Sequence, residues 1–231
     1  MTAGSSRESL GVGKSRGVGR VRESGSAIDL GTWKRRDHYL WFRNYAQPFF
    51  SVTVEVDVTA VWNRSRARGA PSFFLSSVFH MLNAANEVEA FRLRLRPRGV
   101  WRHDRVAVGP TIMRSDDTFG FVRLQSAATL KTFAAQGRSA IARAASRTVL
   151  SPYKATDDIV FHSVLPWLRF TGFTNALPGG ADSIPRIVFG RCARDGRRVK
   201  MPVAVEVHHA VVDGLDVARF FDRFTDHLNG G

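Results

Sequence analysis

Hydrophobic and polar residues alternate along part of the chain with the period of a β-strand. In residues 49–62, FFSVTVEVDVTAVW, valine occupies every second position from Val52 to Val58, and the positions between are polar. This pattern predicts a half-buried strand. Residues 185–207 predict two strands joined at Asp195-Gly196, a pair typical of a tight hairpin turn. Shorter runs predict strands over 105–114 and 119–125 and a strand pair over 157–176.

Three stretches carry apolar residues at helical spacing, and each predicts a helix. Residues 72–91 repeat such positions at Phe74, Val78, Met81, Leu82 and Ala85. Residues 215–228 repeat them at Val217, Phe221, Phe224 and Leu228, and Asn229-Gly230 marks the end of that helix. The alanine-rich residues 127–146 predict a third helix, with a break at Gly137. Thr32 is the predicted N-cap of a further, short helix.

These elements follow one another without a regular βαβ rhythm, which predicts an α+β fold with a mixed or antiparallel sheet. The chain has 231 residues, a length that suits one well-buried domain. Residues 1–26 are rich in Gly, Ser and Arg with little apolar periodicity, so they are predicted to be a disordered basic extension. The domain is then predicted to span residues 27–231.

Composition excludes several classes of protein. A hydrophobic content of 44% suits a globular core. No window approaches a membrane span, and the N-terminus lacks the apolar region of a secretory signal. A single cysteine, Cys192, excludes an internal disulfide framework and a thiolate metal cluster. We therefore expect a soluble, cytoplasmic protein that is not associated with a membrane.

The net charge of +14 could attract a polyanion such as nucleic acid. The basic residues are 29 arginines and five lysines, spread along the whole chain. In the most basic stretch, residues 92–105, alternation places the three arginines from Arg92 to Arg96 opposite Leu93 and Leu95. This pattern favours a solvated strand face over a nucleic-acid patch. Nucleic-acid binding, as the alternative, would show a steep dependence on salt.

The candidate chemistry lies near the C-terminus, in residues 201–221, MPVAVEVHHAVVDGLDVARFF. A strand ending at Val207 would deliver His208 and His209 to its end, and Gly214 would allow a sharp turn into the last helix. Neighbouring strand residues point to opposite faces, so one histidine at most can enter a given cavity. Because the pair diverges and no third ligand stands at a suitable spacing, we expect no metal site.

Residues 208–214, HHAVVDG, resemble the H-H-x-x-x-D-G signature shared by chloramphenicol acetyltransferase-like acyltransferases, condensation domains and, loosely, dihydrolipoyl acyltransferases. Three more segments, 28–42, 163–173 and 190–211, resemble the chloramphenicol acetyltransferase family in order and spacing. Condensation domains need about twice this length, and dihydrolipoyl acyltransferases usually lack the N-terminal segment. The resemblance implies that family's two-layer fold, with a mixed β-sheet packed with helices.

The resemblance also implies a role for each matching residue. His209 would be the general base that takes the proton of the acceptor hydroxyl. Ser163 would stabilise the tetrahedral oxyanion. Asp213 and Arg35 would form a structural ion pair that holds the loop of His209. The implied binding residues are Arg191, near the coenzyme, and Phe42 and Phe50, at the acceptor.

Some positions depart from the family pattern. Val212 replaces a cysteine, which is a conservative packing change. Val188 replaces a threonine thought to hold a water near the transition state, so that contact is expected to be missing. Pro48 and its surroundings, NYAQPFF, do not reproduce a recognisable chloramphenicol pocket. The catalytic residues are thus better preserved than the acceptor pocket.

The implied function is a CoA-dependent acetyl transfer from acetyl-CoA, or another acyl-CoA, to a hydroxyl of a small molecule such as chloramphenicol. Acetyl-CoA would be a co-substrate, with no permanently bound cofactor. Such an enzyme would inactivate the antibiotic and confer resistance. An acyltransferase of natural-product biosynthesis with another donor or acceptor is the alternative, and a catalytically silent binding protein is a third hypothesis. The resemblance further implies a homotrimer with active sites between subunits.

Overall fold

The computed structural model describes residues 24–146, 156–178 and 182–230. The predicted extension lies outside the described residues up to position 23, whereas its last residues take part in a strand that begins at Gly25. The helices are α1 (Arg36–Phe42), α2 (Thr59–Arg64), α3 (Phe73–Glu87), α4 (Leu130–Ala145) and α5 (Gly214–Gly230), with a 3₁₀ turn at Glu89–Arg92. The strands are β1 (Gly25–Ala27), β2 (Phe49–Asp57), β3 (Leu93–Arg96), β4 (Gly99–His103), β5 (Ala107–Met113), β6 (Phe119–Phe121), β7 (Ile159–Leu165), β8 (Arg186–Gly190), β9 (Ala193–Asp195) and β10 (Arg198–His208).

The strands form two sheets. The larger has the order β2-β10-β8-β7-β5-β6, with β9 paired to β10, and the smaller has the order β1-β4-β3. β7 runs parallel to β5 and β8, while β10 is antiparallel to both β2 and β8. The mixed sheet confirms the predicted α+β class.

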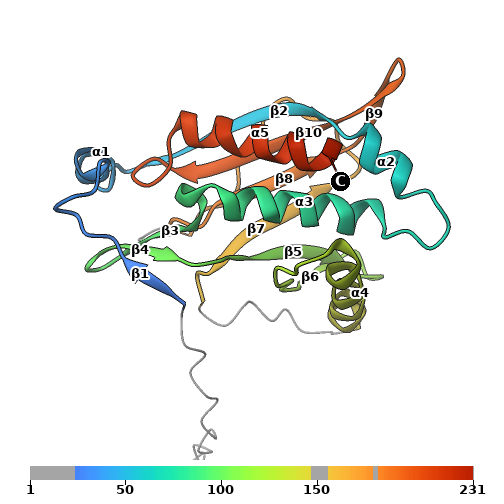
Figure 1. Cartoon of the computed structure of the whole chain (residues 1–231), viewed down its shortest axis with the longest axis horizontal. Helices are drawn as coiled ribbons and strands as arrows, with labels where there is room; N and C mark the ends of the chain where they lie inside the picture. Colours follow the sequence, from blue (N-terminus) through green and yellow to red (C-terminus); the bar gives the residue numbers. More distant parts are fainter. Residues whose placement is uncertain (1–23, 147–155, 179–181, 231) are drawn as a thin grey trace, which may run out of the picture.

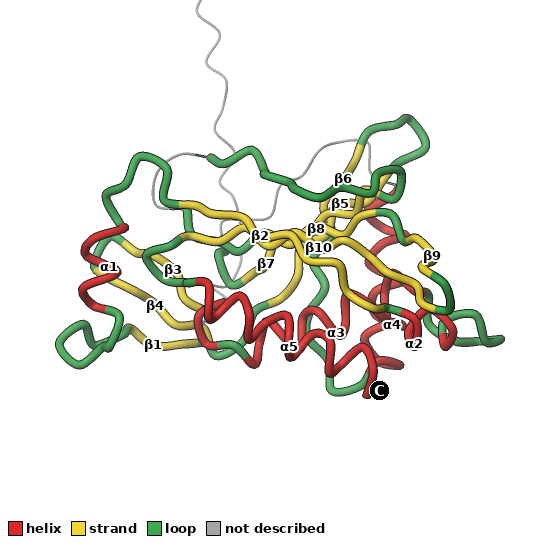
Figure 2. The backbone as a smooth tube through the Cα atoms, turned by 90° about the horizontal axis from the view of Figure 1, so that it is seen from above, coloured by secondary structure: helices red, strands yellow, loops and turns green. Residues whose placement is uncertain are grey.

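One face of the larger sheet is covered by helices (Figure 2). α3 and α5 pack side by side along it (Figure 1). Alternate residues of β10 from Val199 to Val207 face these helices and are buried in the core with Phe220 and Phe224 of α5. The other face is hereafter called the open face. It carries the intervening residues of β10, namely Pro202, Ala204, Glu206 and His208.

Most of the predicted elements are present, and their ends have local causes. α3 begins at Ser72, whose hydroxyl accepts a hydrogen bond from the N–H of Leu75. Thr129 caps α4 in the same way. α5 covers its predicted range, and the β9–β10 hairpin turns at Gly196, which has the positive φ of +58° that glycine tolerates.

Three local predictions are wrong. Thr32 caps no helix, because Asp29 accepts hydrogen bonds from Gly31 and Thr32 in a turn that precedes α1. α4 runs through Gly137 without a break. The glycine allows a close approach of Leu75 of α3, because a Cβ at position 137 would lie 2.7 Å from the Leu75 side chain. After β7, residues 166–178 form no second strand.

The predicted solvated arginine face is also wrong, because Arg94 is fully buried. Its guanidinium donates to the backbone carbonyls of Phe91, Leu93, Asp157 and Ile159 at 2.6–3.0 Å. Burial lowers the pKa of Arg94 to about 10, so the side chain stays charged at neutral pH. The alternating pattern predicts that Arg94 is exposed. It is buried instead, because four backbone carbonyls accept the hydrogen bonds that water would otherwise accept from an arginine.

Within the described ranges, no helix is long and apolar enough to cross a membrane. Nor do the residues described there contain a group of three or more His, Cys, Asp or Glu side chains arranged to hold a metal ion.

Candidate active site

His209 lies in the turn that joins β10 to α5. Its N–H donates to the carbonyl of Pro48 at 2.8 Å, which ties the turn to the segment leading into β2. The N–H groups of Val211 and Val212 both donate to the carbonyl of His208 at 3.1 Å, and both valine side chains are buried. The backbone at His209 is therefore held from both sides, and Val212 fills a packed position.

The imidazole of His209 contacts two aromatic rings. Phe42, the last residue of α1, stacks on it with ring centroids 4.0 Å apart and planes 11° apart. Phe50 of β2 contacts it at 4.9 Å with a tilt of 53°. Among the described residues the buried Nδ1 has no hydrogen-bond partner. Both predicted acceptor-binding residues thus contact the histidine directly.

Arg35 joins the residues of this turn. Its guanidinium pairs with the carboxylate of Asp213, lies 3.8 Å from that of Asp216, and donates to the carbonyl of His209 at 3.4 Å. Arg35 immediately precedes α1, whose Tyr39 is buried and anchors the helix. One side chain therefore connects α1, the backbone of His209 and the start of α5.

Asp213 and Asp216 form a reciprocal cap at the start of α5, each accepting from the backbone N–H of the other at 3.1–3.2 Å. Burial would raise the pKa of Asp213, but the N–H of Asp216 and the charge of Arg35 hold that pKa below its ordinary value. Burial and the neighbouring Asp213 raise the pKa of Asp216. The sequence analysis missed Asp216, although an Asp-x-x-Asp pattern after a strand is a recognisable cap signal.

Ser163 lies on the open face of β7, away from this turn. Its Cα partner in β8 is Val188, and the Oγ1 of Thr111 donates to its Oγ at 3.3 Å. Ser163 lines a cavity of about 720 Å³ together with Thr111, Val188 and the rings of Phe121 and Phe161. We call it the serine cavity.

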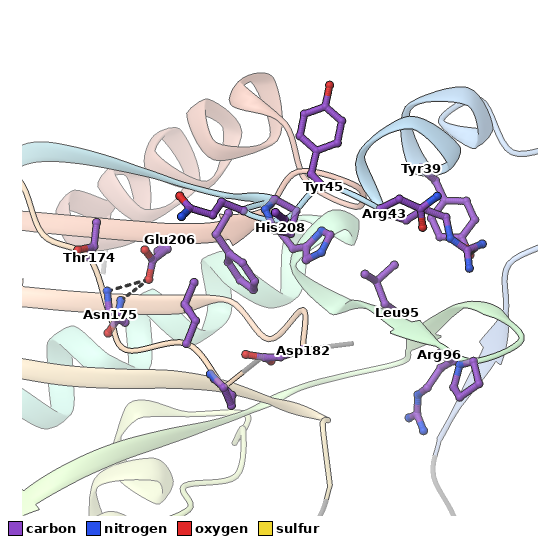
Figure 3. Close-up of a pocket in the computed structure, with 18 residues that line it drawn as sticks. Tyr39, Arg43, Tyr45, Leu95, Arg96, Thr174, Asn175, Asp182, Glu206 and His208 are labelled. Atoms are coloured by element: carbon purple, nitrogen blue, oxygen red, sulfur yellow. Dashed lines mark hydrogen bonds between the residues drawn. The ribbon is translucent and has the colours of Figure 1, made fainter. Parts of the chain in front are cut away.

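A second cavity, of about 770 Å³, adjoins the serine cavity on the open face. One wall is the segment Asn44–Phe49, where the sequence departs from the family pocket. We call it the glutamate cavity, because Glu206 of β10 lines it and is 4% exposed (Figure 3). The residues that line both cavities are Arg96, Asn175 and Pro178. The sequence analysis missed Glu206, whose signal is a charged residue inside the apolar run MPVAVEV.

His209 and Ser163 are far apart within one chain. The strand register aligns Ser163 with Val188 and Val188 with Ala204, so the three lie in one row across β7, β8 and β10. His209 follows Ala204 by five residues, about 17 Å along the strand, and Ser163 lies two strand spacings away, about 10 Å. The two Cα atoms are therefore about 19 Å apart, well beyond common contact with one reacting atom.

Arg191 follows β8 towards the opposite end of β10 from His209. It is exposed, its N–H donates to the carbonyl of Leu168 at 2.8 Å, and it borders an apolar cavity of about 360 Å³ beside Cys192. The structure thus brings Arg35, Phe42, Phe50, Asp213 and His209 together, and it separates Ser163 and Arg191 from them.

His208 points to the open face, opposite His209, and is buried against the edge of the Phe49 ring. Its Nδ1 accepts a hydrogen bond from the N–H of Ala210 at 3.2 Å, which requires an unprotonated nitrogen. Burial is the main cause that lowers the pKa of His208 to about 4, as it does for His80 and His162.

These buried histidines predict an acid sensitivity of the fold. Unfolded imidazoles bind protons below about pH 6.5, whereas the folded ones stay neutral down to about pH 4. The free energy of unfolding is therefore expected to fall as the pH decreases through this interval. Urea titrations at a fixed protein concentration measure it, and His208→Gln is expected to weaken the dependence. An unchanged slope in that variant would contradict the assignment.

The chain is similar to known proteins along most of its length. A family model described as chloramphenicol acetyltransferase matches residues 25–225. Chloramphenicol acetyltransferase 2 of Escherichia coli is 30% identical, over 84% of this chain and 92% of its own length. A chloramphenicol acetyltransferase of Streptomyces acrimycini is 32% identical, over 83% and 89%. A solved chloramphenicol acetyltransferase structure is 28% identical, with a TM-score of 0.80 over 89% of this chain and all of that one. A probable dihydrolipoamide acetyltransferase from Listeria monocytogenes, at 12% identity, shares the fold with a TM-score of 0.65 over 84% and 89%.

Proposed function

This chain belongs to the chloramphenicol acetyltransferase family, and we propose that it transfers the acetyl group of acetyl-CoA to a hydroxyl of a small molecule such as chloramphenicol. The observation that carries this proposal is the fixed imidazole of His209, stacked on Phe42 and tied through its carbonyl to the Arg35–Asp213 pair. Acetyl-CoA is a co-substrate in this proposal, and no permanently bound cofactor takes part.

In the proposed reaction, His209 acts as the general base. Because its Nδ1 is buried, Nε2 is the nitrogen that takes the proton of the acceptor hydroxyl in this proposal. The acceptor oxygen attacks the thioester carbonyl, and the hydroxyl of Ser163 donates to the oxyanion that forms. Collapse of the intermediate breaks the C–S bond, and the departing thiolate receives the proton from His209. The products are the acetyl ester and free CoA.

The separation of about 19 Å supports an active site built from two copies of the chain. His209 of one subunit would meet Ser163 of the next, in the homotrimer that the family resemblance implies. Large apolar side chains at the end of β5, in β6 and after β7 are exposed in the single chain and would be covered by a neighbour. They are Met113, Phe119, Trp167 and Leu168. In such an assembly the serine cavity of one chain would face His209 of another.

The acetyl donor, acetyl-CoA, would bind near Arg191. Arg191 is an exposed cation beside an apolar cavity, a combination that suits a phosphate group attached to a long flexible chain. We propose that Arg191 contributes to binding the phosphates of CoA.

A second candidate keeps the chemistry and changes the acceptor. It is favoured by the composition of the glutamate cavity, which carries the polar side chains of Asn175, Asp182 and Glu206. An acceptor from natural-product biosynthesis, with polar groups that match these side chains, would then replace chloramphenicol.

One assay tests the proposed function. The purified full chain with acetyl-CoA and chloramphenicol is expected to release free thiol at a rate that saturates with both substrates. Absence of release with chloramphenicol, together with CoA binding measured by calorimetry, would support the second candidate. A chain that does not bind CoA would contradict acyl transfer from CoA altogether.

A further inference from the structure

Glu206 is a buried carboxylate on the open face of the sheet. It is 4% exposed, and among the described residues no arginine, lysine or histidine nitrogen lies within ion-pair distance of it. A buried charge without a paired cation is costly unless other polar groups compensate it. A carboxylate within the apolar run Met201–Val207 therefore calls for a functional explanation.

The two carboxylate oxygens of Glu206 differ in their partners. Oε2 accepts hydrogen bonds from the backbone N–H of Asn175 at 3.0 Å and from its side-chain amide at 2.8 Å. Within the described ranges, Oε1 accepts no hydrogen bond from the protein. Figure 3 shows the carboxylate beside Asn175 on the wall of the glutamate cavity. Oε1 is therefore a hydrogen-bond acceptor available to a molecule in that cavity.

The cations that face this region are engaged with other groups. Arg186 is the Cα partner of Glu206 on β8, but its guanidinium pairs with Asp182 and donates to the carbonyl of Ile184. Arg96 pairs with Asp157, and Arg43 donates to the hydroxyl of Tyr39. None of these contacts involves Oε1 of Glu206. This arrangement suits a neutral or cationic donor from a ligand, and it disfavours a further acceptor.

Glu206 and Ser163 lie on the same face of the sheet, at a distance that one acceptor can span. Glu206 is two residues beyond Ala204, which is in register with Ser163 through Val188. Strand geometry then places the Cα atoms of Glu206 and Ser163 about 12 Å apart. The serine cavity and the glutamate cavity adjoin along this line. An acceptor of chloramphenicol's size that reacts beside Ser163 would reach Glu206 with its far end.

We propose that Glu206 determines acceptor specificity by selecting molecules that carry an N–H or O–H donor at the end remote from the reacting hydroxyl. This inference rests on the proposed function, because it assumes that the acceptor reacts beside Ser163. Asn175 holds one oxygen of the carboxylate in place, and the ligand's donor binds the other. A ligand without the donor is disfavoured at such a site, because the buried acceptor oxygen is then left without a hydrogen bond.

Chloramphenicol and its amine analogue provide a direct test. Chloramphenicol carries a nitro group at the far end of its ring, and nitro oxygens only accept hydrogen bonds. In the analogue an amine replaces the nitro group and donates instead. The wild-type chain is expected to acetylate the amine with a kcat/KM roughly tenfold higher than that for chloramphenicol, on the scale of one hydrogen bond to a charged group.

The variant Glu206→Gln separates recognition from structure. Its side-chain carbonyl can still accept both bonds from Asn175, while its NH₂ group faces the cavity as a donor. We expect the preference for the amine to disappear or reverse. Glu55→Gln is the matched control, since Glu55 is an exposed glutamate of β2 on the same face that pairs with Arg169. Its preference is expected to equal that of the wild-type chain.

The outcomes distinguish this inference from the proposed function. An equal preference in the wild-type chain and in Glu206→Gln would overturn the role of Glu206. If neither compound is acetylated, the proposed acetyl transfer to this acceptor is contradicted. The role of Glu206 is then tested by measuring the binding of the same two compounds by calorimetry. A binding preference for the amine that Glu206→Gln removes would support the inference without the reaction. Absence of binding by both compounds would overturn both.

Discussion

Replacement of His209 by alanine is expected to lower kcat for acetyl transfer roughly 10³-fold, within the range that general-base catalysis contributes. The imidazole of His209 lies just after β10, stacked on Phe42 and in contact with Phe50. Its removal leaves the acceptor hydroxyl without a base, because the neighbouring His208 points to the opposite face and has a pKa lowered to about 4. Thiol release with saturating acetyl-CoA and acceptor measures the effect.

A matched control separates loss of the base from loss of the fold. His227→Ala removes a histidine in the last turns of α5, where it contacts Glu87 and lies far from the turn at His209. This variant is expected to keep its activity. Circular dichroism and CoA affinity should be unchanged in His209→Ala, since the backbone bond to Pro48 does not involve the side chain. A His209→Ala protein that keeps more than about a tenth of the activity would contradict a base role.

Replacement of Ser163 by alanine is expected to lower kcat roughly 10²-fold or more, the usual effect of removing one oxyanion donor. The KM values should change little, because the proposed hydrogen bond forms only as charge develops on the thioester oxygen. Thr111, whose hydroxyl contacts Ser163 at 3.3 Å, is the polar group left beside the vacated position. An effect below about fivefold would remove Ser163 from the mechanism.

Mixing the two inactive variants tests whether an active site spans two chains. If His209 of one copy meets Ser163 of another, hetero-oligomers of His209→Ala and Ser163→Ala contain some sites with both native residues. Co-expression or joint refolding is then expected to restore part of the activity that each variant lacks. Mixed oligomers that stay inactive, while each variant assembles normally, would place the site within one chain and would contradict the distance argument.

The elements that could be predicted from the sequence are those in which the spacing of hydrophobic residues follows the period of a strand or a helix. The helical stripe of α5 is buried where the sequence indicates, and β2 forms within its predicted range, although Val54 in its alternating run is exposed. The wrong predictions concern positions where a tertiary contact overrides the local rule. Arg94 is buried because four backbone carbonyls accept hydrogen bonds from its guanidinium. α4 continues through Gly137 because Leu75 packs against that glycine. The carbonyls of Asp157 and Ile159 and the side chain of Leu75 belong to segments distant in sequence, which local patterns do not contain.

For the candidate site, too, some features follow from the sequence and others only from the tertiary structure. The amino-acid sequence by itself determined the family, because its motifs match in order and spacing, and it supplied the roles proposed for His209, Ser163, Asp213 and Arg35. The tertiary structure decided how those residues are grouped. The register of the sheet separates His209 from Ser163 by more than any side chain can reach. The packing of Asn175 on β10 likewise determines that Oε2 of Glu206 accepts two hydrogen bonds on the wall of the glutamate cavity, which no local pattern contains.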